Sequence, residues 1–238
     1  MRLNRRHTLR LLSATVLGIS LPAMASPSSA IRIIGVGDAG CNIVLAAWSS
    51  GLLQENEYRP EFACVTMGQQ SSQAISKAQR LHPDSAPIGT VQLGRLGSGG
   101  DVGIARDAAH KHQDGLRYLT IGAEIVILVA GLGGGTGSGV SPILTAMAKD
   151  TGAHTLAVVV TPFNWEGRNP TAFDAIKVLR SHCDYMVALS NQAAGDAMGD
   201  NATLEDVIKH LEQDGADSIW MLMRLGTRFS KNNQNRLP

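Results

Sequence analysis

Aromatic residues are scarce in this sequence, where ten Phe, Trp and Tyr make up only 4% of 238 residues. Proteins that bind single-stranded nucleic acid stack the bases on aromatic rings, so the composition argues against that class and against carbohydrate platforms built in the same way. The three cysteines, Cys41, Cys64 and Cys183, are too few and odd in number for a disulfide framework. They are typical of reduced thiols buried in a core.

Basic residues are not in excess in the body of the chain. Four of the 21 arginines and lysines are arginines within the first 25 residues, and the remaining 17 face 20 acidic residues. A body with a slight negative charge lacks the positive surface on which nucleic-acid binding depends. Nucleic acid is therefore not an expected partner.

The N-terminal segment has a pattern of its own. A charged stretch, Asn4–Arg10, precedes the apolar stretch Leu11–Ala25, and the small residues Ala23-Met24-Ala25 come before Ser26. This order is typical of a signal peptide, and the pair Arg5-Arg6 resembles a twin-arginine export signal. The alternative is a short basic tail that runs into a helix. The apolar stretch is too short and too interrupted for a stable membrane span, and reduced cysteines argue against export, so cytoplasm and export both stay open.

From Ile31 onward, patterns typical of strands alternate with patterns typical of helices. The strands are apolar on both faces, as in a parallel sheet with helices on both sides. This alternation predicts one doubly wound α/β domain with a mostly parallel sheet and no second domain. It spans residues 31–225, between a signal-like or disordered segment 1–30 and a polar tail 226–238. The predicted strands are Ile31–Gly37, Phe62–Met67, Glu124–Ala130, Thr155–Phe163 and Asp184–Ser190, and the predicted helices are Cys41–Leu52, Ser71–Leu81, Ile104–Leu119, Ser141–Gly152, Ala172–His182 and Leu204–Leu225.

Glycine, in contrast, is abundant at 26 residues and gathers in three clusters. GVGDAG (Gly35–Gly40) and GLGGGTGSG (Gly131–Gly139) each follow a predicted strand and precede a helix, and RLGSGGD (Arg95–Asp101) lies between them. Ligands of doubly wound sheets bind outside the carboxyl ends of the strands. Glycine lets the backbone approach a ligand and turn its N–H groups inward, and a helix N-terminus adds a partial positive charge. The clusters therefore predict a phosphate site, with the hydroxyls of Thr136 and Ser138 as further donors.

Two common kinds of phosphate site do not fit. A P-loop needs Lys before Ser or Thr, and GGGTGSG contains no lysine. A dinucleotide site favours an acid at the end of the second strand, where Thr66-Met67-Gly68 stands instead. For Gly35–Gly40 alone, a tight turn without a ligand is the alternative. Without a lysine, the phosphate charge must be met by backbone dipoles, and a metal ion is expected beside them.

The segment Gly133–Gly139, GGGTGSG, resembles the GGGTG[ST]G signature of the tubulin and FtsZ GTPases. IRIIGVGDAGCN (Ile31–Asn42) is similar to the first nucleotide loop of FtsZ, and RLGSGGDVGIARDAA (Arg95–Ala109) to its third loop and the helix that follows. TPFNWEGR (Thr161–Arg168) is similar to the P-F-x-[FW]-E-G segment. The resemblance covers about Ile31–Leu225 and implies the Rossmann-like GTP-binding domain of that family, with a guanine nucleotide across the strand ends.

The resemblance also implies a set of site residues for GTP or GDP together with Mg²⁺. The loops would surround the phosphates, Glu166 would accept hydrogen bonds from the ribose, and Asn191 would bind the base or the ribose. Glu205 falls near the position at which a family acid or amide recognises the guanine edge. The implied site residues are Gly37, Asp38, Ala39, Gly40, Asn42, Gly99, Gly100, Gly133, Gly134, Gly135, Thr136, Gly137, Ser138, Glu166, Arg168, Asn191 and Glu205.

The chain departs from the family pattern in three places. Asp38 stands where FtsZ has glycine, which puts a carboxylate beside the phosphates unless a metal bridges them or the side chain turns outward. The second loop loses an acid at Thr66-Met67-Gly68. Pro170 replaces an arginine, for which Arg168 is the available substitute. These changes bear on nucleotide affinity more than on the fold.

FtsZ hydrolyses GTP between subunits, where an acidic loop of one subunit meets the nucleotide face of the next. That loop and the activating domain are expected to be lacking, because Leu225–Pro238 contains no acid, and phosphoryl transfer depends on such placed charge. The first hypothesis is therefore a GTP-binding protein that caps or modulates filaments of full-length FtsZ-type subunits in cell division. The alternatives are a GTPase active only with such a partner, and an interaction module that kept the fold and lost the nucleotide.

Overall fold

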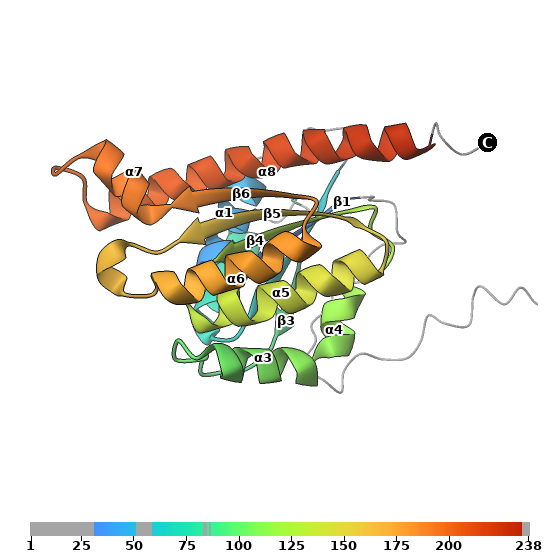
Figure 1. Cartoon of the computed structure of the whole chain (residues 1–238), viewed down its shortest axis with the longest axis horizontal. Coiled ribbons are helices and arrows are strands. Elements are labelled where there is room, and N and C mark those ends of the chain that lie inside the picture. Colours follow the sequence, from blue (N-terminus) through green and yellow to red (C-terminus); the bar gives the residue numbers. More distant parts are fainter. Residues whose placement is uncertain (1–30, 51–58, 83–84, 86, 235–238) are drawn as a thin grey trace, which may run out of the picture.

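A six-stranded parallel sheet forms the centre of the protein (Figure 1). The computed structural model describes residues 31–50, 59–82, 85 and 87–234. Within that part of the chain the strand order is β3-β2-β1-β4-β5-β6, and all neighbouring strands are parallel. This confirms the predicted doubly wound α/β class. The strands are β1 Ile31–Val36, β2 Glu61–Thr66, β3 Ile88–Gln92, β4 Ile125–Gly131, β5 His154–Thr161 and β6 Tyr185–Ser190.

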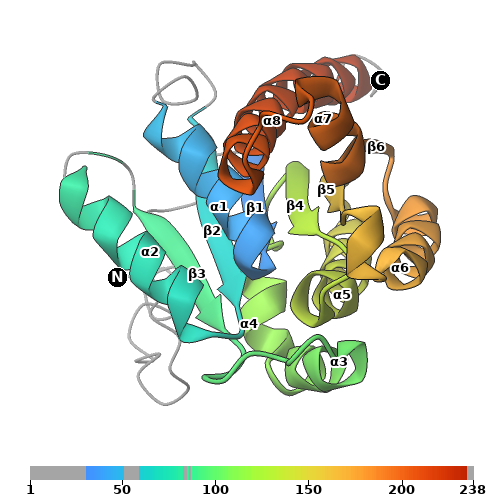
Figure 2. The same cartoon turned by 90° about the vertical axis from the view of Figure 1, so that its left-hand side faces the viewer.

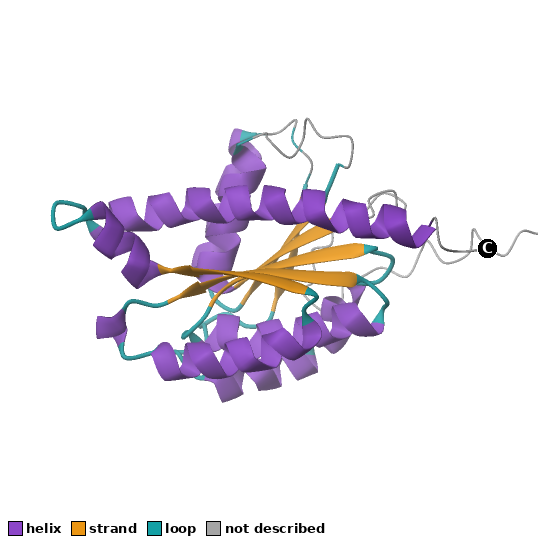
Figure 3. Cartoon of the chain, turned by 45° about the horizontal axis from the view of Figure 1, so that its top comes forward, coloured by secondary structure: helices purple, strands orange, loops and turns teal. Residues whose placement is uncertain are grey.

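Helices cover both faces of the sheet (Figure 3). One layer contains α1 (Gly37–Ser49), α2 (Gln69–Leu81), α7 (Asn191–Met198) and α8 (Leu204–Gln234), and the other contains α3 (Val102–Lys111), α4 (Gln113–Tyr118), α5 (Gly135–Asp150) and α6 (Asn169–His182). Successive residues of a strand pack against the two layers in turn, because their side chains point alternately to the two faces of the sheet. On β1, Ile33 packs with the first layer and Ile34 with the second, and both are fully buried. Each buried side chain of this size contributes roughly 1.5–3 kcal/mol of hydrophobic free energy.

Caps and prolines set where several helices begin. Asp101 accepts a hydrogen bond from the backbone N–H of Ile104 at 3.0 Å and starts α3, and Ser190 accepts one from Ala193 at 3.2 Å and starts α7. Pro170 lies in the first turn of α6, where a missing N–H leaves no helical hydrogen bond unmade. The proline that replaces an arginine of the family pattern is thus compatible with the helix it begins.

Some predicted boundaries differ from the structure. The helix expected over Ile104–Leu119 is two helices, α3 and α4, separated at His112, whose backbone angles are not helical. The strand β3 is absent from the prediction altogether, since Ile88–Gln92 is short and has only two fully apolar large residues. The helix α5 begins at Gly135 and not at Ser141, because the glycine loop already has helical geometry. Pro142 therefore lies inside α5.

The long helix α8 extends past its predicted end at Leu225 to Gln234. Gly226 allows this part of α8 to lie against the sheet, since an added Cβ there would stand 3.1 Å from side-chain atoms of Ile125 and Leu156. The predicted signal segment, residues 1–25, lies outside the described residues. None of the helices in the described ranges is long and apolar enough to cross a membrane.

The carboxyl ends of all six strands meet at one edge of the sheet, which faces the viewer in Figure 2. The order of the strands changes direction between β1 and β4. From β1 the chain adds strands outward to β3 on one side, and from β4 it adds strands outward to β6 on the other. Loops after β1 and β4 therefore leave in opposite directions, to α1 in one layer and α5 in the other. Such a switch point opens a crevice in which doubly wound proteins bind ligands.

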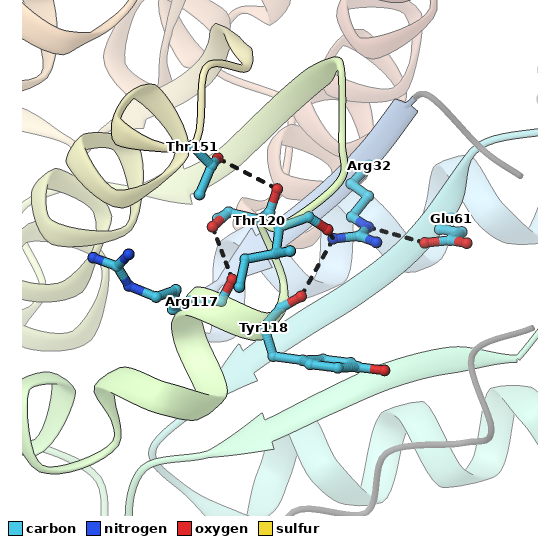
Figure 4. Close-up of polar contacts among 7 residues, drawn as sticks. Arg32, Glu61, Arg117, Tyr118, Thr120 and Thr151 are labelled. Atoms are coloured by element: carbon cyan, nitrogen blue, oxygen red, sulfur yellow. Dashed lines mark hydrogen bonds and ion pairs between the residues drawn. The ribbon is translucent and has the colours of Figure 1, made fainter. Parts of the chain in front are cut away.

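At the opposite ends of the strands, a buried arginine joins β1, β2, the end of α4 and the turn that follows α4 (Figure 4). Arg32 is 7% exposed and donates to the carboxylate of Glu61 at 2.9 Å. It also donates to the backbone carbonyls of Tyr118 and Ile121 at 3.3 and 2.6 Å. The Arg32 side chain thereby satisfies three acceptors and links β1 to β2 and to the end of α4.

Replacing Arg32 with methionine tests this contact. Arg32→Met leaves the Glu61 carboxylate and two carbonyls without their donor, so we expect a loss of about 3 kcal/mol in the free energy of unfolding. Lys177→Met is the control, because the pair of Lys177 and Asp174 has side chains 77% and 76% exposed and should change stability by less than about 0.5 kcal/mol. Urea unfolding followed by circular dichroism gives both values. Equal losses in the two variants would contradict the assignment.

Candidate functional site

A cavity of about 480 Å³ lies at the carboxyl edge of the sheet, over the switch point between β1 and β4. Its wall is built from the starts of α1, α5 and α7, the loop before α3, the short 3₁₀ turn Asn164–Glu166 and one face of α8. Segments far apart in the sequence thus meet around one space. The sequence-predicted residues that line it are Gly37, Asp38, Ala39, Asn42, Gly99, Gly100, Gly134, Gly135, Thr136, Gly137, Glu166, Arg168 and Asn191.

The first and last glycine loops pack directly on the strand ends. A Cβ on Gly40 would collide with the carbonyl oxygen of Val129 in β4, and a Cβ on Gly137 would collide with that of Gly131. Gly37 has a φ of 70° and lies against Thr136 and Gly137, where an added Cβ would stand 3.3 Å from the Gly137 nitrogen. The two loops are therefore in contact with each other, and the N-termini of α1 and α5 open into the same cavity.

The loop before α3 uses its glycines differently. Gly97, Gly99 and Gly100 have φ values of 76°, 61° and 87°, and a Cβ on any of them would meet nothing within 4 Å. Backbone conformation, and not close packing, therefore selects glycine at these positions. The loop is held by a hydrogen bond of 2.7 Å from the Gly97 N–H to the carbonyl of Met67, and both Gly97 and Met67 line the cavity.

Glu166 and Arg168 form an ion pair on the wall of the cavity. The Arg168 guanidinium lies 3.0 Å from one carboxylate oxygen of Glu166, and the other oxygen accepts from the backbone N–H of Phe163 at 2.9 Å. The Glu166 side chain is 13% exposed and that of Arg168 56%. Glu166 is thus fixed in place, while Arg168 keeps donors for an anion in the cavity.

Asp38 lies in the first turn of α1 and is held from the side. The buried Ser71, in the first turn of α2, donates a hydrogen bond to its Oδ1 atom. The carboxylate therefore remains in the wall of the cavity and is joined to a neighbouring helix.

Four sequence-predicted residues are not among those that line the cavity. Gly40 lies behind the first loop against β4, and Gly133, with a φ of 94°, packs on Pro162 and Arg168. Ser138 is buried, and its hydroxyl oxygen accepts the Gly133 N–H at 2.8 Å, so it fastens the loop and does not face the cavity. Glu205 is exposed on α8 and pairs with Lys209 at 2.7 Å.

The acid that α8 does place in the cavity wall is Glu212, which the sequence reasoning missed. It lies seven residues after Glu205, which is two helical turns along the same stripe and about 10.5 Å further along the axis. Ile208 and Leu211 line the cavity beside it, and Ile208 lies three residues before Leu211 and four before Glu212, which is the spacing that marks one face of a helix. Burial raises the pKa of Glu212, and a hydrogen bond with Asn42 and the charge of Lys209 lower it in part.

Anion binding is the chemistry that this arrangement favours. Residues of two helix N-termini and of three glycine loops line one space, and each helix N-terminus carries roughly half a positive charge. Within the described residues, His, Cys, Asp and Glu side chains nowhere form a group of three or more that could hold a metal ion by themselves. A metal at this cavity would need oxygens from a ligand to complete its coordination.

A larger groove of about 830 Å³ lies between α2 and the end of β3. Its wall is made mainly of α2 side chains with Gln92–Arg95 and His112. The groove is outside the switch point, and its wall contains neither the first nor the last glycine loop. Volume alone would select this groove, but the convergence of helix N-termini selects the smaller cavity.

Comparison with known proteins agrees with this geometry. Residues 30–199 match the model of the Tubulin/FtsZ family, GTPase domain. The chain belongs to the tubulin/FtsZ family. The resemblance inferred from the glycine motifs is thereby confirmed.

Relatives within the tubulin/FtsZ family include the cell division proteins FtsZ of Coxiella burnetii and Mycoplasmopsis pulmonis. The first is 34% identical over 192 residues, covering 77% of this chain and 46% of the relative, and the second is 33% identical over 212 residues, covering 86% and 52%. A solved FtsZ dimer from M. jannaschii is 25% identical with a TM-score of 0.66, covering 79% of this chain and 52% of that one. CetZ from Methanosaeta thermophila, at 17% identity, shares the fold with a TM-score of 0.68 over 82% of this chain and 54% of its own. The chain spans about half the length of the relatives it matches.

Two glycines of the last loop differ in how closely they pack against the backbone. Gly137→Ala should lower the free energy of unfolding by about 1–3 kcal/mol, because its Cβ would overlap the Gly131 carbonyl. Gly134→Ala should leave stability nearly unchanged, because Gly134 has a φ of −85° and a Cβ there would meet nothing within 4 Å. Thermal melting of the two variants measures the difference. If Gly134→Ala is the less stable of the two, the loop does not pack as described.

Proposed function

We propose that this chain binds GTP and GDP in the cavity over the switch point. The observation that carries the proposal is the meeting of three glycine loops with the N-termini of α1 and α5 around one space in a member of the tubulin/FtsZ family. A polyphosphate offers only acceptor oxygens and negative charge, which match backbone N–H groups and helix N-termini. The phosphates would lie against Gly134–Gly137 and the loop of Gly99 and Gly100.

The remaining walls of the cavity supply contacts for the ribose and the base. Glu166 and Asn191 line the side towards β5 and β6, where Glu166 can accept from ribose hydroxyls. Glu212 and Asn42 line the side towards α8. The guanine edge presents two adjacent N–H donors, which a carboxylate accepts, whereas adenine presents one donor and one acceptor. We therefore place Glu212, and not Glu205, beside the base.

Nucleotide binding and its base contact are tested together. A ligand that binds the native state raises its apparent stability, so saturating GDP with magnesium should raise the melting temperature. At a hundredfold excess of GDP over Kd, the free energy of unfolding should rise by about 2.7 kcal/mol. Glu212→Gln should weaken GDP binding about tenfold, which corresponds to about 1.4 kcal/mol. Glu205→Gln should bind like the wild type, because Glu205 is exposed and paired with Lys209.

Fluorescence titration with a labelled GDP measures these affinities, and ATP competes as the control for base selectivity. An unchanged melting temperature with millimolar GDP and GTP would refute the proposal and favour an interaction module without nucleotide. A loss of affinity in Glu205→Gln but not in Glu212→Gln would contradict only the assignment of the base contact.

A second proposal concerns assembly with FtsZ-type subunits. Leu96 and Trp165 are 98% and 73% exposed, and each is adjacent in sequence to residues of the cavity wall, Gly97 and Glu166. Trp165 stacks on Phe163 at 5.6 Å, which holds the ring at the rim. Exposed apolar residues around a ligand site are typical of a surface that another protein covers. We propose that an FtsZ-type subunit covers this rim and contributes the acid for hydrolysis. By binding in this way, the chain would cap or modulate filaments of FtsZ-type subunits in cell division.

Mixing experiments test this second proposal. GTP hydrolysis should be slow with the chain alone and should rise when full-length FtsZ is added, beyond the rate of FtsZ itself. Leu96→Ser should reduce this increase at least about fivefold, which corresponds to about 1 kcal/mol of contact energy. Leu81→Ser is the control, because Leu81 is 66% exposed at the end of α2 and is not part of the cavity wall. Phosphate release that is additive in the mixture, with no effect of either variant, would rule out the covered rim.

A further inference from the structure

The charge of the cavity wall is unfavourable for the ligand proposed above. Among the described residues that line the cavity, three are carboxylates, Asp38, Glu166 and Glu212, and one is a cation, Arg168. Arg168 already pairs with Glu166 at 3.0 Å. The N-termini of α1 and α5 add roughly half a positive charge each. With all three acids ionised, the wall remains negative before a nucleotide with its own negative phosphates arrives.

Asp38 is the carboxylate closest in the chain to the phosphate-binding backbone. It stands between Gly37, which contacts the last glycine loop, and Ala39, and all three line the cavity. Ser71 donates to Oδ1 and so turns the carboxyl group by a contact from α2. The second oxygen, Oδ2, has no hydrogen bond from another described residue. An oriented carboxylate with one oxygen open is a ligand that hard divalent cations prefer.

Among the three acids that the described part of the chain places in the cavity wall, Asp38 is the one whose partnering side chain, that of Ser71, lies outside the wall. Glu166 is fixed by Arg168 and by the Phe163 N–H. Glu212 has a hydrogen bond with Asn42 on the side towards α8. Asp38 is left beside the phosphates, where a bare carboxylate repels them and a carboxylate that shares a cation with them attracts them.

We propose that Asp38 is a protein ligand of a divalent cation that binds together with the nucleotide phosphates, which makes nucleotide binding by this chain conditional on the cation. The inference rests on the proposed function, because the phosphates supply the other oxygens. Mg²⁺ suits the arrangement, since it is commonly held by one or two carboxylates together with phosphate oxygens and water. The carboxylate that would otherwise exclude the ligand then takes part in holding it.

The experiment measures the affinity of the full chain for labelled GDP with excess magnesium and with EDTA. Wild type should bind at least about tenfold more weakly in EDTA, a difference of about 1.4 kcal/mol. Asp38→Asn removes the charge at constant shape, so its affinity in EDTA should exceed that of wild type and its ratio between the two conditions should fall below about threefold. Asp38→Gly, which restores the glycine of the family pattern, should behave in the same way. Asp107→Asn is the matched control, because Asp107 is an exposed acid on α3 outside the cavity wall and its removal should leave the wild-type ratio.

Each outcome separates this inference from the proposed function. Wild type that binds equally well in EDTA and in magnesium overturns the role of Asp38 and leaves the nucleotide site standing. Both Asp38 variants keeping the full magnesium dependence of wild type also overturns it, once thermal melting shows that they are folded. Wild type that fails to bind GDP even with magnesium overturns the proposed function itself, and the cation site with it.

Discussion

The site depends on the absence of side chains where α1 and α5 meet the ends of β1 and β4. Gly40 lies against the Val129 carbonyl, Gly137 against the Gly131 carbonyl, and Gly35 so close to α1 that an added Cβ would stand 2.7 Å from the Gly40 oxygen. Any Cβ at these positions would push a helix away from the sheet. Because the helices come this close, both N-termini open at the same point of the strand order. These three glycines therefore act first as packing residues, and the cavity is a consequence of that packing.

The same close packing supplies positive potential to a cavity whose described wall contains no lysine. Backbone N–H groups and helix N-termini provide positive potential that is fixed by the fold, but their charge is partial. Three carboxylates in the wall exceed it, and each has a different partner: Glu166 has Arg168 and the Phe163 N–H, Glu212 has Asn42, and Asp38 has Ser71 from a neighbouring helix. The cavity is thus built around acceptors as much as donors, which suits a ligand with a donor-rich base and a cation-bound polyphosphate.

The fold class and most of the cavity wall could be predicted from the sequence, because alternating apolar strands and glycine loops are local patterns. What could not be predicted depends on distance along an element or on burial. Glu205 and Glu212 share one stripe of α8, and only the position of the helix relative to the sheet shows which of them reaches the cavity. Ser138 has the composition of a ligand donor, but its hydroxyl is used by the Gly133 N–H. The strand β3 escaped the prediction because five residues at the rim of a sheet carry a weak apolar pattern.

We propose that the crevice at the switch point, and not the larger groove beside α2, binds guanine nucleotide. Backbone amide chemical shifts of the full chain, followed during titration with GDP and magnesium, distinguish the two locations. We expect saturable shifts concentrated in Gly133–Ser138, Gly97–Gly100 and Gly37–Asn42, with smaller changes around Glu212. Shifts confined to Gln69–Arg80 and Gln92–Arg95, or none at millimolar nucleotide, would contradict it.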